Sequence, residues 1–137
     1  MWQELIPGVW KGDPEAKVRI EIPFLPDRAL SPNARVYWAE RYRAAEVLKD
    51  AAYYLAREKG IPPEFKRAIV RITYVVSTNR VRDPDNWLIM AKPAIDGLVA
   101  AGVFPDDSEG VLRYCPVVFR VTKESPKMVI EVKEGWD

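Results

Sequence analysis

The sequence predicts one small α+β domain, in which a mixed β-sheet of about four strands packs with two main helices. Two kinds of segment predict this fold. In some, apolar residues alternate with polar ones, and in others apolar residues recur every three or four positions. Their order is strand, helix, strand, helix, strand, strand, which is typical of helices packed on one sheet. A chain of 137 residues leaves room for a single domain, and we assign residues 1–16 to an irregular lead-in and 17–137 to the domain.

The first strand begins at Lys17 and ends at Pro23 and Pro26, because proline interrupts strand pairing. Its apolar face comprises Val18, Ile20, Ile22 and Phe24. A turn at residues 31–33 then starts a long helix, which ends at Gly60. The aromatic side chains of this helix are expected mainly to pack it on the sheet, with a dimer interface or stacking on opened bases as alternatives. They are Trp38, Tyr42, Tyr53 and Tyr54.

The second strand is expected over residues 67–76. A loop over residues 77–85 follows it and leads to a second helix over residues 86–101. Gly102 ends this helix. Pro93 falls inside it, where the missing N–H group predicts a modest kink.

The last part of the chain predicts a loop over residues 104–108 and two strands, over 111–121 and 128–132. Pro116 should fall at an edge or a bulge of the first of these strands. Cys115, beside it, is the only cysteine and is expected to be a small buried side chain. A lone cysteine excludes an internal disulfide. With no leader-like start and no apolar run long enough to span a membrane, it predicts a cytoplasmic protein without membrane contact.

Charge is divided unevenly along the chain, although the net charge is only +1. Residues 28–82 carry twelve basic and five acidic groups, whereas residues 83–110 carry one basic and six acidic groups. A basic surface beside an acidic pocket suits an enzyme that holds cations and acts on a polyanion, and chance segregation on a solvated surface is the alternative. The chain has no histidine, so a histidine triad and a histidine-ligated zinc site are excluded. Catalysis would rest on carboxylates, Lys, Ser, Tyr or an oxygen-ligated metal.

The most informative segment runs from Arg82 to Asn86 and reads Arg-Asp-Pro-Asp-Asn. Asp83 and Asp85, separated by one residue, can converge on a shared cation. The structural alternative is a turn followed by a helix cap at Asp85 or Asn86. A calcium loop of the EF-hand type is excluded, because Trp87 stands where that loop needs a further oxygen ligand.

Further charged residues follow this segment. The second helix would present Lys92 and Asp96 on the same side as Asp85, opposite an apolar stripe, and an ordinary surface pair of Lys92 with Asp96 is the alternative. Asp106 and Asp107 lie in the next loop. Carboxylates gathered from these places would repel one another unless a cation bound them. All-oxygen ligation points to Mg²⁺ or Mn²⁺, which could polarise a scissile phosphate and activate water.

In order, spacing and residue type, three segments resemble the RusA family of Holliday junction resolvases. They are the Arg82–Asn86 segment, then Lys92-Pro93-Ala94-Ile95-Asp96-Gly97-Leu98, and finally Asp106-Asp107 after Gly102. The matched core spans residues 82–107. The resemblance implies a homodimer that binds four-way, branched double-stranded DNA and introduces paired nicks with magnesium, in DNA recombination and repair.

Carried over by position, the resemblance implies that Asp83, Asp85 and Asp107 are the metal-binding catalytic carboxylates. Lys92 would be the catalytic lysine that holds the scissile phosphate or water, although it lies about one helical turn further along than in shorter members of the family. Residues implied to support these groups are Asp96, Asp106 and Asn86. The resemblance implies DNA contacts by Arg82, Asn33 and Tyr37. Arg80 and Arg41 are candidates for phosphate contact because of their charge, with a solvated surface as the alternative.

Two alternatives stay open. One is a catalytically inactive module of prophage origin that binds branched DNA and uses the acidic loop only structurally. The other is a magnesium-dependent phosphatase, for which no nucleophile motif surrounds Asp83.

Overall fold

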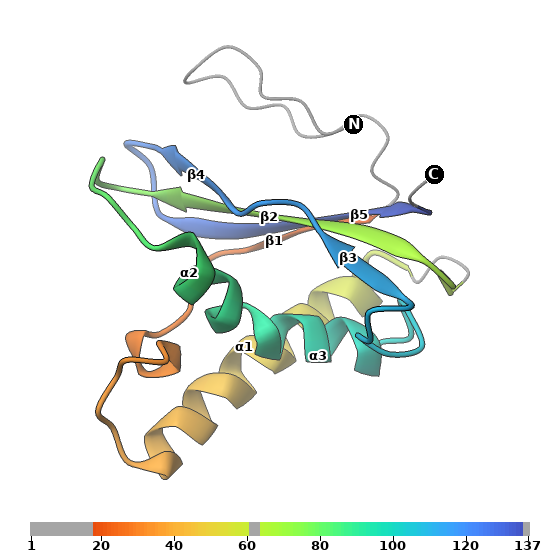
Figure 1. Ribbon diagram of the computed structural model, residues 1–137, viewed down its shortest axis with the longest axis horizontal. Helices are drawn as coiled ribbons and strands as arrows, with labels where there is room; N and C mark the ends of the chain where they lie inside the picture. The colour runs from red at the N-terminus through yellow and green to blue at the C-terminus, as the bar shows by residue number, and fades with distance from the viewer. Residues whose placement is uncertain (1–17, 61–63, 136–137) are drawn as a thin grey trace.

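The computed structural model describes residues 18–60 and 64–135, which form a five-stranded sheet with helices on one of its faces (Figure 1). The expected lead-in, residues 1–16, lies outside the described residues. The described elements are, in chain order, β1 (Val18–Ile22), the 3-10 helix η1 (Arg28–Leu30), α1 (Trp38–Glu58), β2 (Ala68–Val76), α2 (Pro84–Met90), α3 (Lys92–Ala100), β3 (Leu112–Tyr114), β4 (Val118–Val121) and β5 (Lys127–Glu134).

The sheet is mixed, as the sequence predicts. Its order is β1-β5-β2-β3, and β4 also pairs with β2. Strands β1 and β2 both run antiparallel to β5, whereas β3 and β4 run parallel to β2. The two long central strands are therefore β5 and β2, and each of them pairs with other strands along both of its edges. A loop leads from the C-terminal end of β2 to α2.

The expected strand over residues 111–121 is wrong in one respect, since it forms two separate strands, β3 and β4. Pro116 lies in the gap between them, because it has no N–H group to donate to the ladder. Both strands pair with β2 at the edge of the sheet, which confirms the predicted edge position of Pro116. Cys115 donates its backbone N–H to the Val70 carbonyl at 2.9 Å, but its side chain is half-buried, so the prediction of a buried thiol is wrong.

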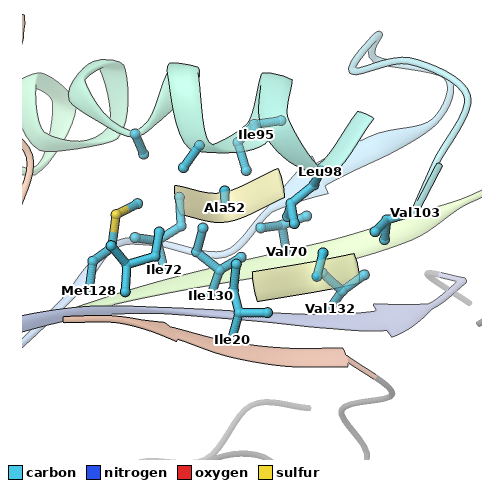
Figure 2. Packing of buried hydrophobic residues seen from close by; sticks show 14 of the residues in the cluster. Ile20, Ala52, Val70, Ile72, Ile95, Leu98, Val103, Met128, Ile130 and Val132 are labelled. Carbon is cyan, nitrogen blue, oxygen red and sulfur yellow. The ribbon is translucent and has the colours of Figure 1, made fainter. Parts of the chain in front are cut away.

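The core lies between the sheet and the helices (Figure 2). The predicted alternation is confirmed in β1, where Ile20 and Ile22 are fully buried. Ile72 and Ile130, from the central strands, point into the same layer, and each buried side chain of this size contributes roughly 1.5–3 kcal/mol. The opposite face of the sheet also holds buried polar side chains, which simple alternation does not predict. They are Arg71, Thr73 and Glu131.

Helices α1 and α3 pack closely at Gly97. A Cβ atom there would overlap the carbonyl oxygen of Lys49 and approach the Cβ of Ala52 to 3.0 Å, so only glycine allows this approach. The three buried residues of α1 lie from the middle of the helix onward, and they are Leu48, Ala52 and Ala56. The first half of α1 extends beyond this contact toward the periphery of the molecule (Figure 1).

The predicted packing of the α1 aromatic residues on the sheet is wrong for three of the four. Trp38, Tyr42 and Tyr54 are 80%, 59% and 67% exposed. Tyr53 is half-buried against the core and its ring contacts that of Tyr54 edge-on at 5.0 Å. The sequence shows that these aromatic residues lie on the helix, but it does not show how much of the helix the rest of the fold covers.

The predicted helix over residues 86–101 is wrong in its continuity and its start. It is two helices, α2 and α3, which meet at Ala91. Because Pro93 lacks an N–H group for the carbonyl four residues earlier, it starts a new helix rather than kinking one. Gly102, with φ of 87°, ends α3 as predicted. The expected apolar stripe is confirmed, since its members Met90, Ala91, Ala94, Leu98 and Ala101 are all buried.

Within the described residues, no helix has the length and apolar character needed to cross a membrane.

Candidate active site

The position of α2 on the sheet is set by an aromatic cluster. The hydroxyl of Tyr74, on β2, donates to the backbone carbonyl of Trp87 at 2.6 Å, and the two ring centroids are 4.7 Å apart. Phe119, on β4, lies 5.8 Å from both rings. Burial raises the pKa of Tyr74 far above its ordinary value, so the hydroxyl stays a donor. The start of α2 is thereby fixed near the end of β2.

Asp83 is the cap of α2 and Asp85 lies within its first turn. The Asp83 side chain accepts the backbone N–H of Asp85 at 3.0 Å, and Pro84 occupies the first helical position. The structural alternative in the sequence, a helix cap, is therefore present, but the capping residue is Asp83 and not Asp85 or Asn86. Both carboxylates are exposed, and Asn86 is half-buried in the same turn.

Arg82, immediately before the cap, holds its own loop. Its guanidinium donates to the carbonyls of Thr78 and Arg80 at 3.0 and 3.1 Å, and to the Thr78 hydroxyl at 3.0 Å. It also lies over the Phe119 ring at 5.8 Å. Burial and the neighbouring charge of Arg80 lower the pKa of Arg82. These contacts support the loop, while the expected DNA contacts of Arg82 and the exposed Arg80 stay predictions.

The loop between α3 and β3 carries the third acidic element. Phe104 is fully buried and anchors it, and the Val103 N–H donates to the Leu98 carbonyl at 3.0 Å. Asp106 accepts the Ser108 N–H at 2.7 Å, and hydrogen bonds from the Ser108 hydroxyl and backbone lower the pKa of Asp106. Asp106 thus forms the turn, and the adjacent Asp107 is left to face α3.

Lys92 joins α3 to this loop. Its ammonium forms ion pairs with Asp96, one turn along α3, and with Asp107. Partial burial disfavours the charged lysine, but its hydrogen bonds to Asp107 and Asp96 outweigh that effect and raise the pKa of Lys92 above its ordinary value. The surface pair with Asp96, which the sequence offered as the alternative, is therefore present. Lys92 also reaches Asp107, a contact that helix geometry alone did not predict.

A pocket of about 330 Å³ opens beside this cluster. It is lined by Leu88, Ile89, Lys92, Ile95, Asp107 and Tyr114. Tyr114, from β3, was not identified from the sequence. Burial and the nearby charge of Asp107 raise its pKa. No local pattern could have found it, because only the pairing of β3 with β2 brings Tyr114 beside the loop.

The structure brings together Lys92, Asp96 and Asp107. Asp85 lies three and four residues before Leu88 and Ile89 on α2, so it is one helical turn from the α2 wall of the pocket. Over residues 18–60 and 64–135, no three carboxylate or thiol side chains are grouped as ligands of one metal ion. Convergence of Asp83 and Asp85 on Asp107 therefore stays a prediction.

The remaining expected DNA-contact residues lie before and at the start of α1. The backbone N–H of Asn33 donates to the Ser31 hydroxyl at 3.3 Å, and Asn33 itself is exposed. Tyr37 is the cap residue of α1 and is 81% exposed. Arg41 donates from its guanidinium to the Ala34 carbonyl at 2.9 Å, which ties the preceding segment to the helix.

Comparison with known proteins adds one relative. No known family profile matches the chain. A protein of Xylella fastidiosa (strain Temecula1 / ATCC 700964), described as an uncharacterized protein, is 36% identical over 81 residues, which are 56% of this chain and 52% of that protein. The chain thus spans about half the length of this relative, and that description names no activity.

Proposed function

We propose that this protein is a magnesium-dependent endonuclease that cuts branched DNA and resolves four-way junctions as a homodimer. One observation carries the proposal: the ammonium of Lys92 meets Asp107 and Asp96 at the edge of a pocket whose α2 wall lies one turn from Asp85. A cation and several carboxylates beside an open pocket are suited to phosphodiester hydrolysis. The resemblance of residues 82–107 to RusA resolvases supplies the substrate class.

The donor set of the site fits a hard divalent cation. Its side chains offer carboxylate oxygens, and the chain has no histidine to favour a softer metal. Asp83, Asp85 and Asp107 would hold the ion. When bound, magnesium supplies charge stabilisation at the phosphate and a more acidic water molecule.

The protein's own groups would orient the substrate around that centre. Lys92, whose ammonium is charged at neutral pH at the ordinary lysine pKa and whose pKa is raised further by Asp107 and Asp96, would contact a phosphate oxygen at the pocket edge. Asp96 would keep the Lys92 ammonium in place while Asp107 binds the metal ion, because Asp96 contacts the same nitrogen from one turn along α3. The hydrogen bonds of Arg82 keep the loop before Asp83 in one conformation, which positions the first carboxylate.

A dimer would match the geometry of the substrate. A four-way junction is close to two-fold symmetric, so two copies related by a two-fold axis would present equivalent sites to opposed strands.

A second candidate is an inactive module that binds branched DNA. Two contacts favour it: Asp83 already caps α2, and Lys92 already neutralises Asp107, so these carboxylates have structural roles. Under this alternative the junction is bound and never nicked.

The deciding experiment incubates the full chain with a labelled synthetic four-way junction and, side by side, with a linear duplex of the same sequence. The proposal expects paired nicks in the junction only when Mg²⁺ or Mn²⁺ is added. Junction binding with no nicks under any metal condition would establish the inactive module. Hydrolysis of a small phosphoester with DNA untouched would establish a phosphatase.

A further inference from the structure

One face of α1, here called the α1 stripe, is buried in the second half of the helix and exposed at its start, among the residues that the structure describes. Its members are spaced by four and three positions and are Trp38, Tyr42, Ala45, Lys49, Ala52 and Ala56. At about 100° per residue these positions share one face of the helix. Ala52 and Ala56 are buried at the contact with α3, whereas Trp38 and Tyr42 are 80% and 59% exposed. Between Trp38 and Val47 no residue is buried.

Large aromatic side chains this exposed, on a helix that extends past its packing partner, indicate a surface that contacts something else. We infer that Trp38 and Tyr42 form a stacking surface for unpaired bases of a branched nucleic acid. The inference rests on the proposed function and names the part of the substrate that this surface would take. In a branched DNA of matched sequence such bases would be opened at the point where the strands exchange.

Charge favours a polyanion as the occupant. Residues 28–49, which include the exposed stripe, carry five basic and two acidic groups. Arg35 and Arg43 are exposed on either side of Trp38 in the sequence, and Arg41 is half-buried within the same turn. A two-fold contact between two copies would bring this net positive segment against itself, which is unfavourable. A phosphate backbone would be attracted by it.

The spacing of the two rings favours unpaired bases over duplex. Trp38 and Tyr42 are separated by one turn, a rise of about 6 Å along the helix. Neighbouring bases of a duplex strand are only about 3.4 Å apart and present no free ring face along the strand. Unstacked bases expose both faces, and each can stack on an aromatic side chain regardless of its sequence.

The test measures binding of a fluorescein-labelled oligo(dT) and of a blunt duplex by anisotropy, in EDTA so that no cleavage occurs. Trp38→Ala and Tyr42→Ala should each weaken oligo(dT) binding roughly five- to 150-fold, the effect of losing one base–aromatic stack. Duplex binding should change much less. Trp38→Phe, which keeps an aromatic ring, should retain most of the affinity.

Tyr54→Ala is the matched control, because Tyr54 is 67% exposed on the same helix but lies outside the stripe. It should leave both affinities unchanged. Equal oligo(dT) affinity in wild type, Trp38→Ala and Tyr42→Ala would overturn the inference, and so would an equal loss for oligo(dT) and duplex. A change from dimer to monomer in Trp38→Ala, with oligo(dT) affinity unchanged, would assign the surface to a second copy and also overturn it.

Failure of the two proposals can be told apart. Aromatic-dependent oligo(dT) binding without junction cleavage in Mg²⁺ would remove the endonuclease and leave the stacking surface. Metal-dependent junction cleavage, together with oligo(dT) binding that is unchanged in Trp38→Ala and Tyr42→Ala, would refute only the stacking surface.

Discussion

Lys92 and Asp107 form an ion pair across the turn that joins α3 to β3. They are distant in sequence and come from different elements, so the tertiary fold is what brings them together. The contact places one cation and one carboxylate at the edge of a pocket that Tyr114 and the α2 residues Leu88 and Ile89 help to line. The proposed chemistry depends on this pair more than on any other contact.

Asp85→Asn should lower the rate of junction cleavage roughly 100-fold or more, because it removes a carboxylate that would hold the metal ion while hardly changing the shape of the side chain. Junction binding should persist, since the residue is exposed and contributes its backbone N–H, not its carboxylate, to the helix cap. Single-turnover cleavage and a binding titration measure the two effects. Asp50→Asn, at an exposed carboxylate of α1, is the control. Full cleavage activity in Asp85→Asn would refute the assignment.

Gly97→Ala should destabilise the fold by about 1–3 kcal/mol. Alanine is the better helix former by about 1 kcal/mol, but its Cβ would overlap the Lys49 carbonyl, so the two helices would have to separate. Urea unfolding measures the change. Gly110→Ala is the matched control and should be close to neutral, because nothing lies within 4 Å of the added carbon. Equal stability of the two variants would show that α1 and α3 are not in this close contact.

Tyr74→Phe should cost about 1–2 kcal/mol, because it leaves the Trp87 carbonyl without the hydroxyl that now donates to it. This hydrogen bond joins β2 to α2, the helix that carries Asp85. Without it the cleavage rate should also decrease, though less than in Asp85→Asn. Thermal unfolding and single-turnover cleavage measure both. Tyr54→Phe removes an exposed hydroxyl and serves as the control. A cleavage rate equal to wild type would show that this link does not position Asp85.

Much of the fold could be predicted because local patterns report which side of an element faces the core. Alternation identified the buried face of β1, and Gly102 marked the end of α3. The break at Ala91 was missed because the sequence shows the proline but not whether packing favours a kink or a new helix. Lys92 with Asp96 follows from helix geometry alone.

Other features of the fold depend on contacts between elements that are distant in sequence, and the periodicity of apolar residues does not predict such contacts. The order of the strands was not predicted, and it is the parallel pairing of β3 with β2 that places Tyr114 beside the site. The exposure of Trp38 and Tyr42 was missed for a related reason. Their spacing matches that of the buried residues further along α1, and only the extent of α3 decides which part of the stripe is covered.

Glu21→Gln should lower stability at neutral pH by about 0.5 kcal/mol, the scale of a partly exposed pair. The hydrogen bond from Lys127, at 2.5 Å, and the contact with Arg19 lower the pKa of Glu21. A depressed pKa contributes stability above its ordinary value of 4.5 and loses it as the pH falls through the folded value. The difference from wild type should therefore shrink as the pH falls below 4.5 through the lowered folded pKa. Urea unfolding at neutral pH and at a series of acidic pH values tests this, and Lys127→Met should remove much of the same pH-dependent difference.

Lys92→Met should separate metal binding from cleavage. In the structure the ammonium neutralises Asp107, so a divalent cation approaching that carboxylate must displace or tolerate a positive charge. Removing the ammonium should tighten Mn²⁺ binding to the free protein roughly fivefold, which corresponds to about 1 kcal/mol for unit charges in water. Cleavage at saturating Mg²⁺ should nevertheless fall roughly 100-fold, because the group that would hold the phosphate is gone.

Electron paramagnetic resonance of free Mn²⁺ measures the change in metal binding, and single-turnover cleavage measures the change in rate. Lys66→Met, at an exposed position outside the site, is the control. Weaker Mn²⁺ binding in Lys92→Met would mean that the lysine supports the metal site instead of competing with it. Unchanged cleavage would remove Lys92 from the catalytic group.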